Sequence, residues 1–257
     1  MTGSDCMGKV AIVTGGAAGI GEATAVRLGA AGVTVVVADR NDGLPTVEKI
    51  RAEDGDARFV EMDVRSSSDW RDLVAEVSSK YGRVDYLANV AGVVNTISAD
   101  TVTGLTEEAW DYVVDTNLKG TWLGMKHAIP EMTKVGGGRI VNIASMAALR
   151  GIDNLAAYSA SKGGVVSLTK QAAVEYGAHS ILINAICPGT IDTTIVRGFT
   201  REERIERAGV HIIKRLGLPD EVASMVKYLL LEGSFLTGEI YPVDGGWSAR
   251  GHFDSKQ

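Results

Sequence analysis

The sequence predicts an α/β protein built on a doubly wound parallel sheet of about seven strands flanked by helices. Two observations carry this prediction. Apolar, β-branched segments alternate with helical patterns from one end of the chain to the other, which is typical of a parallel sheet covered on both faces. No linker, repeat or low-complexity tract separates these segments. Since crossovers are right-handed, the economical topology is a single Rossmann-type domain over residues 1–257.

Seven segments have the apolar, β-branched character of strands. They are Val10–Thr14, Val33–Ala38, Arg58–Met62, Tyr86–Val90, Arg139–Ala144, Ile181–Ile186 and Glu239–Val243. Six segments between them carry helical patterns and provide the crossovers. They are Gly19–Ala31, Leu44–Glu53, Ser67–Tyr81, Thr106–Met132, Tyr158–Tyr176 and Pro219–Leu231.

The connection after the sixth strand is the exception to this rhythm. Residues 188–210 form a long connection for an α/β protein, and they include the charged run Arg201–Arg207. We interpret these charges as the solvated face of a helix, held by ion pairs four residues apart. Long connections are usually functional, so we expect this one to act as a lid over a substrate.

Composition and charge exclude several classes of function. The chain has a net charge of −6 and is 45% hydrophobic, which fits a soluble globular protein and disfavours nucleic acid as a partner. No apolar run approaches the roughly 20 residues that cross a bilayer, and the N-terminal residues lack the pattern of a secretory signal. We therefore expect a cytoplasmic protein.

Cys6 and Cys187 form no motif. The histidines lack the spacing of metal ligands, so no metal is expected; they are His127, His179, His211 and His252.

A glycine-rich loop follows the first predicted strand. The loop reads Thr14–Gly21, with glycines at 15, 19 and 21 in a GxxxGxG spacing. Glycines at such a turn let the backbone approach a pyrophosphate and aim the next helix N-terminus at its charge. We expect Gly15, Gly19, Ile20 and Gly21 to bind a dinucleotide.

An acidic residue ends the second predicted strand. Asp39 lies 24 residues beyond Gly15, where a carboxylate can accept hydrogen bonds from the adenosine ribose. A carboxylate there repels a 2′-phosphate, which favours NAD over NADP. Arg40 is the complication, since an arginine beside this position could bind that phosphate.

A proton-transfer set follows the fifth predicted strand. Tyr158 and Lys162 are four residues apart, which places both on one face of a helix. A nearby ammonium and an oxidised nicotinamide ring would favour the phenolate and lower the pKa of Tyr158. Ser145 ends the strand, so its hydroxyl could hold a substrate oxygen within reach of Tyr158.

Together these motifs resemble the short-chain dehydrogenase/reductase family, and the resemblance runs from about Lys9 to Trp247. The family's Asn-Asn-Ala-Gly motif appears as Asn89–Gly92, with Val90 in place of the second asparagine. We expect that change to affect strand support more than chemistry. The family's catalytic asparagine matches Asn117.

The resemblance implies hydride transfer between NAD and a secondary alcohol or ketone. Tyr158 would be the acid/base, Ser145 would fix the oxygen, and Lys162 would bind the nicotinamide ribose. Asn117 would hold a water that links Lys162 to solvent. The residues expected to bind the cofactor are Gly15, Gly19, Ile20, Gly21, Asp39, Arg40, Asp63, Val64, Asn89, Ala91, Gly92, Tyr158, Lys162, Pro188, Gly189 and Thr193. Those expected to bind the substrate are Ser145, Ala147, Leu155 and Tyr158.

The expected partners are a small, largely apolar alcohol or ketone and further copies of the chain. Family members are commonly homotetramers or homodimers assembled through the long helices, and Gly163 and Gly164 would permit close helix approach. Arg150 and Arg197 are candidate anchors for an anionic substrate group.

Two alternative functions remain open. A 3-oxoacyl-thioester (acyl carrier protein) reductase usually prefers NADP and a basic docking face, which Asp39 and the net charge disfavour. A non-catalytic NAD(H)-sensing regulator of the same fold would tend to lose the tyrosine or the lysine, and both are present here.

Overall fold

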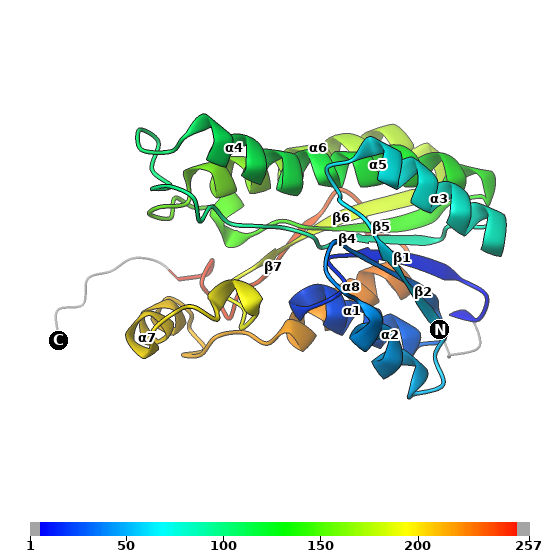
Figure 1. The fold of residues 1–257 in the computed structure, drawn as a ribbon, viewed down its shortest axis with the longest axis horizontal. Helices are drawn as coiled ribbons and strands as arrows, with labels where there is room; N and C mark the ends of the chain where they lie inside the picture. The colour runs from blue at the N-terminus through cyan, green and yellow to red at the C-terminus, as the bar shows by residue number, and fades with distance from the viewer. Residues whose placement is uncertain (1–5, 251–257) are drawn as a thin grey trace.

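The computed structural model describes residues 6–250, and its centre is one parallel sheet (Figure 1). The seven strands have the order β3-β2-β1-β4-β5-β6-β7, so the predicted doubly wound sheet is confirmed. The order reverses between β1 and β4, where a crevice forms at the carboxyl ends of the strands. The strands are β1 (Val10–Thr14), β2 (Thr34–Asp39), β3 (Ala57–Glu61), β4 (Tyr86–Asn89), β5 (Gly138–Ile143), β6 (Ile181–Pro188) and β7 (Ile240–Val243).

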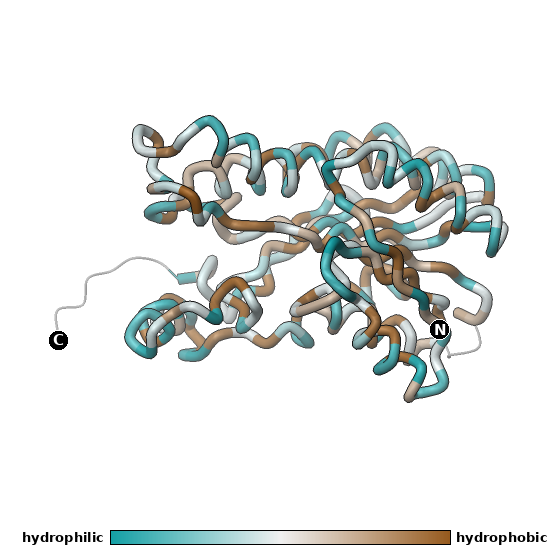
Figure 2. Tube along the Cα trace, in the orientation of Figure 1, coloured by the Kyte–Doolittle hydropathy of each residue, from teal (hydrophilic) through white to brown (hydrophobic). Residues whose placement is uncertain are grey.

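Helices cover both faces of the sheet. In Figure 1, α3, α4, α5 and α6 lie on one face, and α1, α2 and α8 lie on the other. Figure 2 shows hydrophobic residues concentrated along the strands and hydrophilic residues on the outer turns of the helices. The helices are α1 (Gly19–Gly29), α2 (Leu44–Arg51), α3 (Ser67–Tyr81), α4 (Glu107–Val114), α5 (Gly120–Lys134), α6 (Ala156–Tyr176), α7 (Arg201–Gly209) and α8 (Pro219–Leu231).

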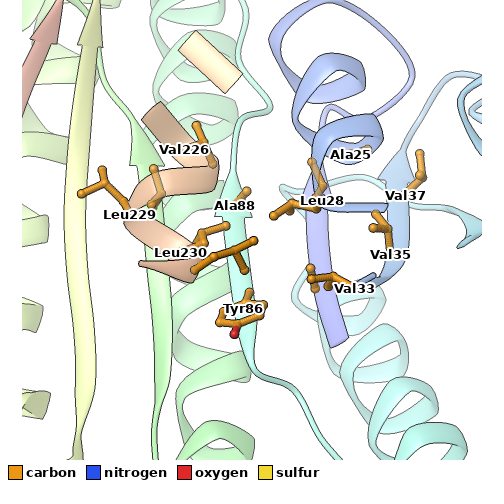
Figure 3. Close-up of a cluster of buried hydrophobic side chains, with 14 of the residues drawn as sticks. Ala25, Leu28, Val33, Val35, Val37, Tyr86, Ala88, Val226, Leu229 and Leu230 are labelled. Carbon is orange, nitrogen blue, oxygen red and sulfur yellow. The ribbon is translucent and has the colours of Figure 1, made fainter. Parts of the chain in front are cut away.

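A hydrophobic core lies on each side of the sheet. On the α1 and α8 side, Leu28 and Leu230 are fully buried against the strands (Figure 3). On the other side, Trp70 of α3 is fully buried and donates from Nε1 to the carbonyl of Val64 at 3.0 Å. Burying both faces is what makes the strands continuously apolar, and it leaves only the strand ends for polar chemistry.

The predicted helix over Thr106–Met132 is interrupted. A π-helical turn, η2 (Asp115–Lys119), separates α4 from α5. Two threonine hydroxyls donate to backbone carbonyls here. Thr116 donates to Tyr112 and Thr121 donates to Asn117, each at 2.7 Å. Such turns inside helices frequently mark functional sites. The helix that the pattern predicted as continuous over Thr106–Met132 is therefore two α-helices joined by a π-helical turn that contains Asn117.

The charged run in the connection forms α7, as expected, but different contacts hold it. Thr200 and Glu203 make a reciprocal capping box at its start, which satisfies two otherwise free backbone N–H groups. Arg204 donates to Asp192, outside the helix, at 2.6 Å. The expected ion pairs four residues apart do not form within this described helix. The one opposite-charge pair at that spacing is Glu203 with Arg207, and the Glu203 side chain is used by the capping box instead.

Across residues 6–250, no helix is both long enough and apolar enough to span a membrane.

Candidate functional site

Most of the expected cofactor residues line a cleft at the carboxyl ends of β1, β2 and β4. The cleft has a volume of about 400 Å³. Because every strand is parallel, residues that follow different strands meet at this one edge. The expected cofactor residues that line the cleft are Gly15, Gly19, Ile20, Gly21, Asp39, Arg40, Asp63, Val64, Ala91, Gly92 and Thr193.

The glycine loop has a shape that side chains would block. A Cβ on Gly15, whose φ is +65°, would lie 2.9 Å from the backbone of Ala91. A Cβ on Gly21 would lie 2.0 Å from the carbonyl oxygen of Gly15. The N-cap residue of α1, Ala18, offers no side-chain hydrogen bond, so the first N–H groups of α1 are available to an anion. The loop fits a pyrophosphate.

Asp39 is held at the rim of the cleft by backbone donors. Its Oδ2 accepts from the N–H of Ala17 at 3.0 Å, and its Oδ1 accepts from the N–H of Asn41 at 2.9 Å. Its neighbour Arg40 donates from Nη2 to the hydroxyl of Tyr112 at 3.3 Å. Both side chains line the cleft, so a carboxylate and a guanidinium share the place expected for the adenosine ribose.

Asp63 lies across the cleft and is paired. Arg65 donates to its carboxylate, at 2.5 Å for the Nη2 to Oδ2 contact, and holds the pKa of Asp63 below its usual value. Arg40 acts in the same direction at longer range. Asp63 therefore stays ionised, which suits an acceptor for an adenine amino group.

Tyr158, Ser145 and Lys162 lie together, as the spacing predicted. Tyr158 and Lys162 share one face of α6, with the Lys162 Nζ 5.8 Å from the centre of the Tyr158 ring. Ser145 follows β5, and its Oγ accepts from the N–H of Ala147 at 3.1 Å. Lys162 donates to the carbonyl of Ile143 at 2.7 Å. The set joins the end of β5 to α6.

Burial shifts both titratable members of this set toward their neutral forms. It raises the pKa of Tyr158, and a hydrogen bond with Ser145 offsets only part of that rise. It lowers the pKa of Lys162 to about 8. We expected Lys162 to lower the pKa of Tyr158, but in the chain itself desolvation of the phenol outweighs any such effect. The positive charge of an oxidised nicotinamide is the remaining source of a lower pKa.

Asn117 connects α6 to the segment after β4. Its Oδ1 accepts from the N–H of Val93 at 2.8 Å, and its Nδ2 donates to the carbonyl of Val93 at 2.9 Å. The same Nδ2 donates to the Oγ of Ser161 at 3.1 Å, and Ser161 donates to the carbonyl of Tyr158 at 2.8 Å. The fully buried Asn117 side chain thus fixes the cleft wall relative to the helix that carries Tyr158.

Two members of the Asn89–Gly92 motif have different roles. A Cβ on Gly92 would lie 3.2 Å from the Nζ of Lys162, so glycine leaves room for the ammonium. Asn89 does not line the cleft, and its side chain donates to Asn142 at 2.8 Å inside the fold. The direct cofactor contact expected of Asn89 is not supported by this placement. The Val90 substitution is accommodated because its backbone N–H donates to Thr14 at 3.0 Å.

The remaining expected cofactor residues lie at the end of β6 and in the connection that follows it. The side chain of Thr193 is 3.2 Å from where a Cβ on Gly19 would lie, so it faces the glycine loop. Pro188 pairs with Val243 in the sheet, and Gly189 packs near the end of β7. Neither lines the cleft. The two expected substrate residues beside Ser145 and Tyr158 are buried Ala147 and half-buried Leu155.

Other expectations meet mixed outcomes. Within the chain, a Cβ on Gly164 would lie 2.6 Å from Leu118, whereas Gly163 faces open space; the expected approach of helices from separate copies stays a prediction. Arg150 donates to the carbonyl of Ser248 at 2.7 Å, which ties it to the C-terminal segment. Cys6 and Cys187 are free and buried. Within residues 6–250 no cluster of metal-binding side chains forms; His252 lies outside the described residues.

Sequence reasoning missed two residues that support the site. Ser161 lies between Tyr158 and Lys162, and its place in the Tyr-Ser-Ala-Ser-Lys run was the available signal. Asp100 caps α6, with its Oδ1 accepting from the N–H of Ala157 at 2.9 Å. Nothing in the sequence signals this cap, because the residue lies more than 50 positions away.

Known proteins resemble the chain over nearly its whole length. Residues 15–248 match the family model described as enoyl-(acyl carrier protein) reductase. The chain is 38% identical over 245 residues to a cyclohexanol dehydrogenase of Acinetobacter sp. (strain SE19), covering 94% of this chain and 96% of that protein. It is 37% identical over 243 residues to a cis-4-hydroxycyclohexanecarboxylate dehydrogenase of Sinomonas cyclohexanicum, covering 94% and 97%.

A levodione reductase supports the likeness in both sequence and structure. The protein of Leifsonia aquatica is 35% identical over 254 residues, covering 94% of each chain. A crystal structure of levodione reductase matches with a TM-score of 0.90 at 34% identity, covering 95% of this chain and 99% of that one.

Proposed function

Because the chain belongs to the short-chain dehydrogenase/reductase family of oxidoreductases, we propose that it interconverts a secondary alcohol and a ketone with NAD. The observation that carries this proposal is the placement of Tyr158, Ser145 and Lys162 at the carboxyl edge of the sheet, beside a cleft that fits a dinucleotide. When bound, the nicotinamide supplies the hydride acceptor or donor.

The proposed chemistry assigns one task to each side chain. In the oxidative direction Tyr158 removes the hydroxyl proton, and in the reductive direction it returns that proton to the carbonyl oxygen. Ser145, whose hydroxyl lowers the pKa of Tyr158 against the effect of burial, would hold the same oxygen. Lys162 carries positive charge beneath the phenol when it is protonated. Asn117 keeps α6 fixed against the cleft and would hold the water that exchanges protons with Lys162.

Asp39 supports NAD over NADP. Its carboxylate is held by the N–H groups of Ala17 and Asn41 and lies at the rim of the cleft. A 2′-phosphate placed beside it would meet a like charge. Arg40 is already hydrogen-bonded to Tyr112, so binding that phosphate would require the guanidinium to leave a partner.

Cyclic secondary alcohols are the substrate class that we propose. The relatives described above are named for cyclohexanol, a hydroxycyclohexanecarboxylate and levodione. The residues next to Ser145 on the expected substrate side are the buried, apolar Met146 and Ala147. Apolar neighbours, of which Ala147 is small, suit a compact ring.

A paired substrate and cofactor panel tests the proposal. Cyclohexanol, substituted cyclohexanols, linear secondary alcohols and 3-oxoacyl and enoyl thioesters are each tested with NAD(H) and NADP(H), following absorbance of the reduced cofactor. We expect turnover of cyclic alcohols with NAD, and its loss in Tyr158→Phe with NADH binding retained. Turnover of thioesters alone would instead identify an acyl-thioester reductase. NADH binding without any turnover would identify a regulator.

A further inference from the structure

One buried histidine lies outside the residues assigned above. His211 follows α7 and is 2% exposed. Its Nε2 lies 3.2 Å from the backbone nitrogen of Thr190, and its Nδ1 lies 2.8 Å from the carbonyl oxygen of Arg215. A carbonyl only accepts and a backbone N–H only donates, so Nδ1 carries the proton and Nε2 accepts. Both ring nitrogens are therefore hydrogen-bonded, Nε2 to the loop after β6 and Nδ1 to the segment before α8.

The imidazole fills the space between three segments. A Cβ on Gly189 would lie 2.7 Å from Nε2, so the loop after β6 closes on the ring itself. The ring of Trp247, after β7, meets it edge-on with centroids 5.9 Å apart. The backbone just beyond His211 is fixed as well, because Ile212 and Ile213 donate to the carbonyl of Gly245 at 2.9 and 3.0 Å.

Thr190 is held on both of its backbone groups by the segment that contains His211. Its N–H donates to the imidazole, and its carbonyl accepts from the N–H of Gly217 at 2.9 Å. Three residues later, Thr193 reaches the cleft and faces Gly19. The hydrogen bonds at Thr190 therefore fix the direction in which the chain enters the cleft. Thr190 itself does not line the cleft.

We propose that His211 is a positioning residue for the cofactor. Because β6 pairs with β5, the loop after β6 begins beside Ser145, where the proposed hydride transfer takes place. By accepting from Thr190, His211 holds this loop at the cleft and so determines the affinity for the nicotinamide half of NAD. This inference rests on the proposed function, because it takes NAD as the ligand of the cleft. The adenosine half would be held by Asp39 and Asp63, which also line the cleft, and its binding should not depend on the imidazole.

Three substitutions separate the acceptor from the bulk of the ring. His211→Gln can place a carbonyl oxygen where Nε2 accepts from Thr190. His211→Asn retains a donor near Nδ1 but cannot reach Thr190, and His211→Phe retains the ring shape without either hydrogen bond. A purely structural role would rank the variants by size and packing. The proposed role ranks them by whether Thr190 keeps an acceptor.

The measurement compares the dissociation constants of NADH and ADP-ribose, which lacks the nicotinamide, by calorimetry on the full chain. In Asn and Phe variants we expect the NADH constant to rise about tenfold, as for a buried donor left unpaired, with ADP-ribose changed by less than about twofold. The Gln variant should recover most NADH affinity. Thermal unfolding confirms that each variant is folded; if the Phe variant is not, the Gln and Asn variants decide the outcome.

Two results would overturn the inference. One is an equal loss of NADH and ADP-ribose affinity in every variant, and the other is no difference between the Gln and Asn variants. Both results are dissociation constants, so they do not depend on whether the chain turns over a substrate. A wild-type chain that binds NADH but oxidises no alcohol contradicts the proposed function and leaves the His211 comparison intact.

Discussion

Asp85 at the amino edge of the sheet and the Tyr158–Lys162 pair at its carboxyl edge respond to burial in opposite ways. At the amino edge, Asp85 precedes β4 and is 3% exposed, yet it receives three donors. Arg83 donates to it at 2.6 and 2.7 Å, Lys9 at 3.0 Å and the N–H of Val10 at 2.9 Å. These contacts overcome burial, and the pKa of Asp85 falls below its usual value. At the carboxyl edge, burial prevails for Tyr158 and Lys162.

This contrast distinguishes a structural charge from a reactive one. A carboxylate with every acceptor position occupied gains nothing by changing its protonation state, and removing it leaves its partners unpaired. A phenol and an ammonium that burial pushes toward neutrality can exchange a proton once a substrate or cofactor changes the local charge. We therefore expect substitutions at the amino edge to affect stability and those at the carboxyl edge to affect turnover.

The largest expected effect is that of Tyr158→Phe. Loss of the phenol oxygen removes the only proton donor and acceptor that we assign to the reacting oxygen, so kcat should fall by about 10³-fold. The ring remains, and the melting temperature and the affinity for NADH should be unchanged. Steady-state kinetics, thermal unfolding and NADH titration measure the three quantities. Retained turnover would place the proton transfer elsewhere.

Asp85→Ala tests the opposite edge. It leaves Lys9 and Arg83 without their shared partner, and because both are about one-third exposed, the unfolding free energy should fall by about 2–3 kcal/mol rather than more. Since the folded pKa of Asp85 is lowered, its contribution is present above about pH 4 and is lost as the pH falls through the folded pKa. Urea unfolding at pH 7 and at low pH measures this. Altered kcat/KM in the folded variant would contradict the division between edges.

Asp39→Ser is a carboxyl-edge substitution that should leave the chemistry intact. Removing the carboxylate removes the repulsion of a 2′-phosphate and leaves Arg40 and a hydroxyl beside it, so the ratio of kcat/KM for NAD to that for NADP should fall by about 10²-fold. Asp42→Ser is the matched control, because Asp42 hydrogen-bonds only to the N–H of Leu44 outside the cleft. Equal changes in both variants would argue against Asp39 as the discriminating group.

Lys162→Met should change the stability by less than Asp85→Ala does, and in the opposite direction. Burial lowers the folded pKa of Lys162 to about 8, below that of an unfolded lysine near 10.4. The unfolded chain therefore binds the proton more tightly, and charging Lys162 costs stability below pH 8. This cost is relieved as the pH rises from about 8 toward 10.4. The variant should be about 1–2 kcal/mol more stable at pH 7 and should lose turnover. Chemical denaturation across pH 7–10 tests this, and a destabilised variant would contradict it.

Local patterns in the sequence predicted the strands and much of the site. Strand identity depends on apolar β-branched runs, the glycine loop depends on local backbone shape, and the Tyr158–Lys162 pair depends on helical spacing. All three are short-range properties. The bounds of the strands shifted by one or two residues, as helix and strand ends commonly do.

The features that the sequence did not predict all depend on contacts between segments that are distant in the chain. Asp100 caps α6 from another loop, and His211 joins Thr190 to Arg215. The groups of the chain itself raise the pKa of Tyr158, because burial is a tertiary property that the pair spacing does not contain; the lower pKa expected beside an oxidised nicotinamide stays a prediction. The interrupted helix at Asn117 likewise follows from its bonds to Val93 and Ser161.

The most direct test of the account is the transfer of an isotopic label. Cyclohexanol carrying deuterium on its carbinol carbon is incubated with NAD and the wild-type chain, and both products are analysed by mass spectrometry and proton NMR. The account predicts that deuterium appears at C4 of the reduced nicotinamide in the same amount as the cyclohexanone formed, and that Tyr158→Phe abolishes this transfer. Cyclohexanone formed without deuterium in the cofactor, or equal transfer by the variant, would contradict it.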